Sequence, residues 1–87
     1  MDDSQILEQL TDIIRDVVNN ETLTLKPETV AADVPEWDSF NHINIVVAAE
    51  VKFGIKFKTA ELEQVRNVGE FVALIERKLS QKKGDRR

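Results

Sequence analysis

The sequence contains no cysteine, and among its 87 residues it has only one histidine, one tryptophan and two prolines. Without cysteine the chain can form no disulfide, no thiolate nucleophile and no cysteine-ligated metal site. No apolar run reaches the length of a membrane span, and the first twenty residues carry acids where a secretion signal would carry basic residues. We therefore expect a cytoplasmic protein without membrane insertion.

Charge is unevenly spread along the chain. The formal net charge is −4, yet residues 82–87 are mostly basic, so the rest of the chain is more acidic than the whole. An acidic body repels phosphate backbones and favours basic partner surfaces, which argues against a nucleic-acid partner. We predict one domain over 1–87, expected to be a monomer, with an ordered core at about 4–80 and a flexible basic tail at 81–87.

Apolar side chains recur at helical spacing in several segments, and no segment keeps the alternation of a strand for long. The pattern predicts three main helices, at about 4–18, 39–53 and 68–79, and one short helix at 59–65. Residues suited to helix ends flank these segments: Ser4, Asp38 and Asn67 at starts, Asn19, Asn20 and Gly54 at ends.

The segment 20–38 holds both prolines and no persistent period, which predicts a long loop between the first two main helices. A loop of this length inside a small domain is often functional. The predicted fold class is all-α, a small helical bundle of three main helices plus one short helix, with this loop between helices 1 and 2.

The stretch EWDSFNHI at 36–43 places Ser39 at the start of the second main helix. Ser39 could be a helix cap, alone or together with Asp38. A Ser39–His42 pair would be neighbours on a helix, but catalysis would also need an orienting carboxylate, an oxyanion hole and a pocket, so we expect His42 to be a solvated polar residue.

Two further interpretations of this stretch concern ligands. A metal site would draw on oxygen ligands whose spacing does not match a calcium loop: Asp33, Glu36, Asp38 and Asn41. A covalent phosphate ester on Ser39 would be stabilised by the amide groups and the positive dipole end of the helix. We therefore predict no metal site and no catalytic residue, and we consider Ser39 a candidate for modification.

The tripeptide DSF at 38–40, the long loop before it and EVKFGIKF at 50–57 together resemble the acyl or peptidyl carrier protein family. The resemblance covers about residues 7–79. It implies that Ser39 receives 4′-phosphopantetheine from coenzyme A and that Asp38 supports the transfer. It also implies a non-enzymatic carrier that holds acyl or aminoacyl cargo as a thioester. The implied partners are a phosphopantetheinyl transferase, an acyl-loading ligase and acyl-using enzymes.

The second main helix carries two apolar stripes where a surface helix normally has one. One comprises Phe40, Ile43, Val47 and Val51, and the other comprises Ile45, Val46, Ala49 and Phe53. Either the whole helix is deeply buried, or the second stripe packs inward while the first faces partners. The resemblance favours the latter, with Asn44 also on the partner surface.

The same helix departs from the resembling family, whose members in primary fatty acid synthesis usually carry several acids along it. This helix has only Glu50, with Asn44 and Val51 where acids would be expected. The sequence therefore favours a stand-alone carrier for a specialised pathway, docking through apolar contact rather than through electrostatic steering.

Trp37, directly before the predicted cap, has two interpretations. It either staples the loop to the second main helix or flanks the prosthetic arm as part of the partner surface. The alternative to a carrier is a helical protein-interaction module in which Ser39 is only a cap.

Overall fold

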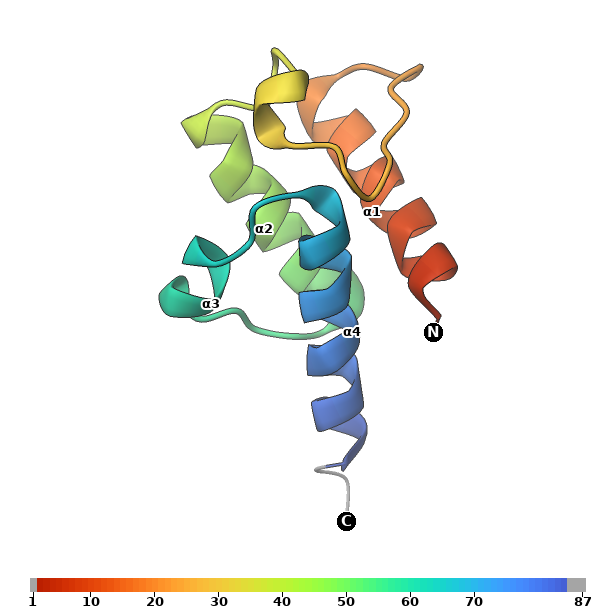
Figure 1. Ribbon diagram of the computed structural model, residues 1–87, viewed down its shortest axis with the longest axis vertical. Helices are drawn as coiled ribbons and strands as arrows, with labels where there is room; N and C mark the ends of the chain where they lie inside the picture. Colours follow the sequence, from red (N-terminus) through yellow and green to blue (C-terminus); the bar gives the residue numbers. More distant parts are fainter. Residues whose placement is uncertain (1, 85–87) are drawn as a thin grey trace.

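The computed structural model describes the backbone of residues 2–84 and the side chains of residues 2–81. The chain forms α1 (Asp3–Val18), a 3₁₀ turn η1 (Ala31–Asp33), α2 (Ser39–Phe53), α3 (Thr59–Glu63) and α4 (Val68–Gly84) (Figure 1). The described residues contain no strand. The structure confirms the predicted all-α bundle of three main helices and one short helix, with a long segment joining α1 to α2.

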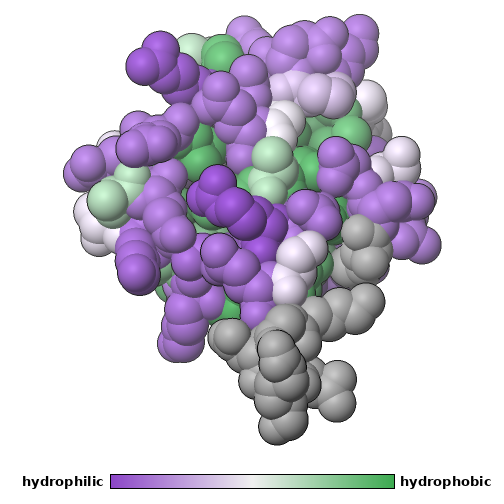
Figure 2. All heavy atoms as spheres, turned by 60° about the horizontal axis from the view of Figure 1, so that its bottom comes forward, coloured by the Kyte–Doolittle hydropathy of each residue, from purple (hydrophilic) through white to green (hydrophobic). Residues whose placement is uncertain are grey.

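The core lies where α1 packs against both α4 and α2. Its largest fully buried side chains come from these three helices: Ile6, Leu10, Ile14, Ile45, Val68, Phe71 and Ile75. Figure 2 shows polar side chains over most of the face at the lower end of the bundle, with apolar atoms in the recesses between them. The stripe with Ile45 and Ala49, both fully buried, is the inward face of α2, as one of the two interpretations predicted.

The start of α1 corrects the prediction that Ser4 is its cap. The cap is Asp2, whose carboxylate accepts the amide hydrogen of Gln5 at 2.9 Å, while the Gln5 side chain accepts the amide hydrogen of Asp2. This reciprocal capping box satisfies two amides at once, so Ser4 falls inside the first turn. The predicted end is confirmed, because Asn19 adopts the left-handed conformation at φ 57°.

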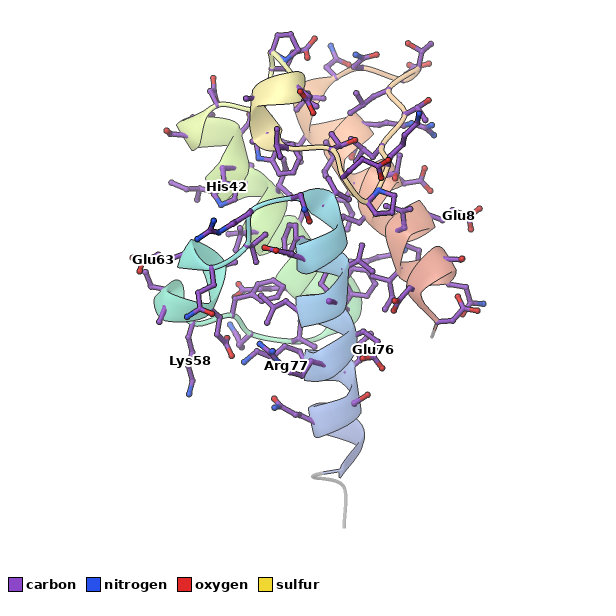
Figure 3. The ribbon with its side chains drawn as sticks, in the orientation of Figure 1. Glu8, His42, Lys58, Glu63, Glu76 and Arg77 are labelled. Atoms are coloured by element: carbon purple, nitrogen blue, oxygen red, sulfur yellow. The ribbon has the colours of Figure 1, made fainter. Side chains whose placement is uncertain are left out.

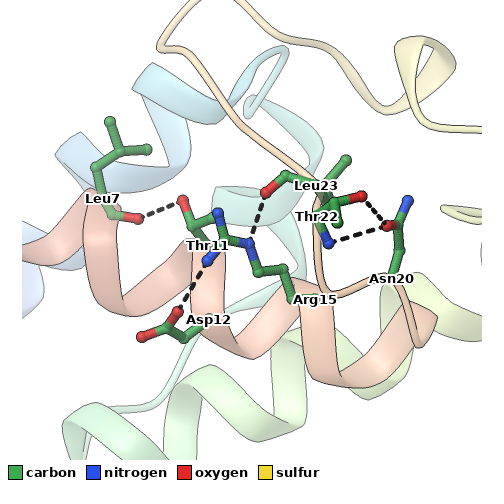
Figure 4. Close-up of polar contacts among 7 residues, drawn as sticks. All are labelled: Leu7, Thr11, Asp12, Arg15, Asn20, Thr22 and Leu23. Carbon is green, nitrogen blue, oxygen red and sulfur yellow. Dashed lines mark hydrogen bonds and ion pairs between the residues drawn. The ribbon is translucent and has the colours of Figure 1, made fainter.

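The long segment between α1 and α2 is pinned at several points along its course. At its start, Arg15 Nε donates to the carbonyl oxygen of Leu23 at 2.6 Å, and an Arg15 guanidinium nitrogen lies 3.5 Å from Asp12 Oδ1 (Figure 4). Leu25 and Val34 are buried in the core. The segment therefore packs across the bundle as part of its structure.

The same segment also closes the N-terminus of α4. The carbonyls of Thr29 and Pro27 accept the amide hydrogens of Val68 and Gly69 at 2.8 and 2.7 Å. The third amide, that of Glu70, donates to the side chain of the predicted cap Asn67. The amides of the first three residues of α4, which have no partner within the helix, are thus all used.

The ends of α3 and α4 differ from their predicted positions. α3 ends at Glu63, two residues early, and α4 continues to Gly84 instead of ending near 79. The backbone of 81–84 is thus helical, where a flexible tail was predicted to begin; 85–87 lie outside the described residues. An ion pair joins the two helices, with Lys78 Nζ 2.8 Å from Glu61 Oε1, and this contact lowers the pKa of Glu61.

None of the helices in the described part of the chain combines the length and the hydropathy that crossing a bilayer requires.

Gly69 is predicted to be a position in α4 where even a methyl group is harmful. A Cβ there would lie 3.0 Å from the carbonyl oxygen of Pro27 and 3.1 Å from its Cβ. We expect Gly69→Ala to lower the free energy of unfolding in urea by about 1–3 kcal/mol, because overpacking outweighs the gain in helix propensity. Ser80→Ala, at an exposed site on α4, is the control and should change little. An equally stable Gly69→Ala would contradict the close approach.

Candidate functional site

Asp38 fixes the start of α2. Its backbone is extended, and its carboxylate accepts the amide hydrogen of Asn41 at 2.8 Å. The Asn41 side chain in turn donates to the carbonyl oxygen of Glu36 at 2.8 Å, which ties the end of the loop to the first turn. The prediction that Asp38 caps this helix is confirmed.

Ser39, the first residue of α2, is exposed, and its hydroxyl makes no hydrogen bond to any other described residue. The hydroxyl is therefore not the cap, because the Asp38 carboxylate already fills that role. The amides of Ser39 and Phe40 likewise have no partner within residues 2–84. This helix start is thus open, whereas that of α4 is closed by the loop. A hydroxyl and two free amides share the positive end of the α2 dipole.

His42 corrects the prediction of a merely solvated residue. It is half-buried, and its Nδ1 accepts the indole N–H of Trp37 at 3.1 Å. The two rings stack, with centroids 6.2 Å apart and planes 25° from parallel. Among the described residues no hydrogen bond joins the Ser39 hydroxyl to His42, so the arrangement does not form a serine–histidine dyad.

Trp37 and His42 flank the Asp38 cap at the positions where a hydrophobic staple forms, one residue before the cap and four after it. Trp37 is half-buried and packs against the core, which supports the prediction that it staples the loop to α2. The second interpretation also has support, since Trp37 lines the hollow beside Ser39 described next.

Two hollows meet at this pair. The outer one is an open depression at the start of α2, lined by Ala31, Trp37, Asp38, Ser39, His42 and Ile43. The inner one is a small, mostly apolar hollow of about 50 Å³ that is itself partly open to solvent, lined by Ala31, Trp37, His42, Leu62, Val65, Arg66, Asn67, Val68 and Phe71. Figure 3 shows His42 on the side of α2 that is turned toward α3.

The outward face of α2 is apolar. Phe40 is 73% exposed, Ile43 62%, Val47 51% and Val51 78%, and Asn44 beside them is exposed as well. The structure thus places the first predicted stripe on the surface and excludes a helix buried all round. Exposed apolar side chains in a row mark an interaction surface.

The acids near Ser39 do not gather around a common point. The Asp33 carboxylate accepts the amide hydrogen of Val30, and that of Asp38 is engaged by Asn41. Among the residues that the structure describes, no group of three or more histidine, aspartate or glutamate side chains is placed to hold a metal ion.

Known proteins with similar sequences indicate the family to which this chain belongs. No family model matches the chain. An acyl carrier protein of Acidothermus cellulolyticus is 35% identical over 71 residues, which is 82% of this chain and 84% of that protein. A meromycolate extension acyl carrier protein of Mycolicibacterium aurum is 33% identical over 73 residues, covering 84% of this chain and 75% of that protein.

A solved structure agrees with these relatives. The solution NMR structure of a holo acyl carrier protein from Geobacter metallireducens superposes with a TM-score of 0.86 and 38% sequence identity, covering 93% of both chains. The fold is that of a small helical carrier. The chain belongs to the acyl carrier protein family, as the resemblance of its sequence indicated.

The residues around Ser39 fit the prosthetic group that this family implies. A phosphodiester on the Ser39 oxygen needs an exposed hydroxyl without a competing internal bond, and the structure offers one. The two free amides at the helix start can donate to phosphate oxygens. The neighbouring depression gives an arm room to lie against Trp37 and Ile43.

The sequence did not indicate one feature of the site, the role of Glu50. Its carboxylate is half-buried and accepts the amide hydrogen of Phe57 at 2.9 Å, after the turn at Gly54. The single acidic residue of α2 therefore stabilises the turn after the helix. Its spacing of seven residues from Phe57 spans a helix end, where no regular pattern could have shown the contact.

Asp38 and Ser39 are predicted to differ in their effect on stability, although they are adjacent. Asp38→Ala should lower the free energy of unfolding by about 1 kcal/mol, because the cap is lost. Ser39→Ala should stay within about 0.5 kcal/mol of wild type, because its hydroxyl has no internal partner. Urea denaturation followed by circular dichroism measures both. A large loss for Ser39→Ala would mean that the hydroxyl supports the helix.

Proposed function

We propose that the protein is a carrier whose Ser39 bears 4′-phosphopantetheine and presents acyl cargo to partner enzymes. The observation that carries this proposal is the exposed Ser39 hydroxyl, without an internal partner at an open helix start, in a chain of the acyl carrier protein family. The proposal assigns no catalytic step to the chain itself, and it places the carrier in the cytoplasm.

Attachment at Ser39 is a phosphoryl transfer. The serine oxygen forms a bond to the pantetheine-bearing phosphorus of coenzyme A and loses its proton. The pyrophosphate P–O bond breaks, and adenosine 3′,5′-bisphosphate leaves. The transferase supplies the catalysis. The chain supplies an accessible nucleophile, held in place by the Asp38 cap, and two amides that stabilise the resulting phosphate charge.

The arm supplies a thiol, to which acyl cargo is bound as a thioester; the chain itself has no cysteine for this purpose. Tethering raises the effective concentration of the cargo for each partner enzyme. In this proposal the fold keeps Ser39 at one end of the bundle, while α2 presents a surface for docking beside it.

The docking surface is the exposed stripe of α2 with Asn44 and the rim residue Trp37. Because Glu50 is bound to the Phe57 amide, α2 has no free carboxylate with which to attract a basic partner patch. Partners should therefore recognise the helix by apolar contact, with little dependence on salt. This departure from an acidic helix favours a specialised lipid, glycolipid or peptide-like pathway over primary fatty acid synthesis.

The attachment is tested by intact mass. Wild-type protein incubated with coenzyme A and a broad-specificity phosphopantetheinyl transferase should gain one phosphopantetheine, and Ser39→Ala should gain none. Ser80→Ala is the matched control and should be modified like wild type. Wild type without a mass gain, or a gain that persists in Ser39→Ala, would reject the carrier function and leave a helical interaction module.

The docking surface is tested by measuring, for the same variants, the rate of phosphopantetheine transfer and the thermal stability. Phe40→Ala and Val47→Ala should reduce the rate of modification by the transferase several-fold, with little change in thermal unfolding, since both side chains are exposed. Ile45→Ala is the contrast on the inward face and should cost about 2–5 kcal/mol of stability. Equal losses of stability in all three variants would contradict an outward docking stripe.

A further inference from the structure

The imidazole of His42 has one nitrogen that no other side chain uses. Its Nδ1 accepts the indole N–H of Trp37 at 3.1 Å, so in the neutral ring the proton is on Nε2. Within the described residues this Nε2–H donates no hydrogen bond. Solvent reaches the atom, because the described part of the chain has no buried side-chain nitrogen or oxygen that lacks a partner. The contact with Trp37 therefore fixes a tautomer that presents a free donor.

The helix brings this donor close to Ser39. The two residues are three apart in α2, a spacing that puts their Cβ atoms about 5–6 Å from each other on the helix surface. Both also line the outer depression at the start of α2. A group that is attached to the Ser39 oxygen and occupies this depression therefore lies against the imidazole.

The charges around the outer depression make His42 the side chain suited to a phosphate. Its other lining residues are Asp38, which is anionic, and four residues without charge. A phosphodiester on Ser39 adds a second negative charge next to the Asp38 carboxylate, and like charges that are close repel. His42 is the lining residue with a donor left for the phosphate, since the indole N–H of Trp37 is already used.

We infer that His42 is a ligand of the phosphate, and that its Nε2–H donates to a phosphate oxygen of the arm on Ser39. The inference rests on the proposed attachment at Ser39 and adds the side chain that holds the first part of the arm in the outer depression. A hydrogen bond to a charged oxygen is about twice as strong as one between neutral groups. The bond therefore favours one orientation of the arm over free rotation, and it takes no part in the attachment chemistry.

Arg66 is the rival cation for this role. It is exposed and lines the inner hollow together with His42, but it does not line the outer depression. Its side chain has no hydrogen bond or ion pair with another residue in the part of the chain that the structure describes. Arg66→Gln removes this charge and leaves His42 unchanged, so it tests which of the two side chains meets the phosphate.

The test compares the stability of the intact protein before and after attachment. Wild type, Arg66→Gln and two variants of His42 are each prepared unmodified and with phosphopantetheine on Ser39, and intact mass confirms the loading. All are unfolded in urea. His42→Asn keeps an acceptor at the place of Nδ1 but does not reach the place of Nε2, whereas His42→Gln keeps a donor there. Because each variant is compared with its own unmodified form, changes in the Trp37 contact cancel.

Attachment should raise the folded-to-unfolded ratio about three- to tenfold more in wild type than in His42→Asn, the range for one hydrogen bond at a solvent-accessible position. His42→Gln should keep most of this gain and Arg66→Gln all of it. An equal gain in wild type and His42→Asn would overturn the role of His42. A gain that is lost only in Arg66→Gln would assign the phosphate to Arg66 and overturn it as well.

Nuclear magnetic resonance follows the contact directly. The arm brings a single phosphorus, and the chain has one histidine, so neither spectrum suffers from overlap. His42→Asn should move the phosphorus signal of the modified protein toward its position in the urea-unfolded protein. The imidazole nitrogen signals of wild type should show the proton on Nε2. A phosphorus signal that is the same in wild type and His42→Asn, or a proton on Nδ1 alone, would reject the bond.

The two proposals fail in different ways. Full attachment at Ser39 with equal gains in stability in wild type and His42→Asn would remove the role of His42 and leave the carrier function intact. Absence of a mass gain in wild type would overturn the carrier function itself, and the role of His42 with it.

Discussion

The arrangement around Ser39 depends on one hydrogen bond, from the amide of Asn41 to the carboxylate of Asp38. By taking this amide, Asp38 relieves Ser39 of any capping role and leaves its hydroxyl in solvent. The same bond sets the residue at which α2 begins. Because successive side chains on a helix are turned by about 100°, Phe40 and Ile43 face outward once Ile45 and Ala49 are packed in the core.

The outward stripe has a cost that the rest of the molecule offsets. Each apolar side chain left in water forgoes about 25 cal/mol per Å² of the surface that burial would hide. The fold is stable without burial of this face of α2, because α1 and α4 supply most of the buried core, including Phe71, Leu10 and Ile75. Glu50 also contributes to the fold, because its carboxylate binds the Phe57 amide and fixes the turn after α2.

Apolar spacing predicted the helices well but not the details of their ends. Asp2 was missed as the α1 cap because Ser4 is as good a capping residue by type, although Asp2 and Gln5 have the spacing of a capping box in the sequence. α4 extends to Gly84 without a further apolar stripe, so periodicity could not reveal it. The two stripes of α2 could not be ranked from the sequence, because the choice depends on how α1 and α4 are placed.

The Trp37–His42 contact shows why part of the site was beyond sequence reasoning. The two residues are five apart, the spacing of a staple around the Asp38 cap, but the sequence did not show that a polar histidine would take the second position and accept the indole N–H. The hollow that they line is also lined by Ala31 from the loop and Phe71 from α4. Those elements meet because the carbonyls of Pro27 and Thr29 close the start of α4. The loop, which showed no regular period in the sequence, thus holds together the two sides of the inner hollow and brings it next to Ser39.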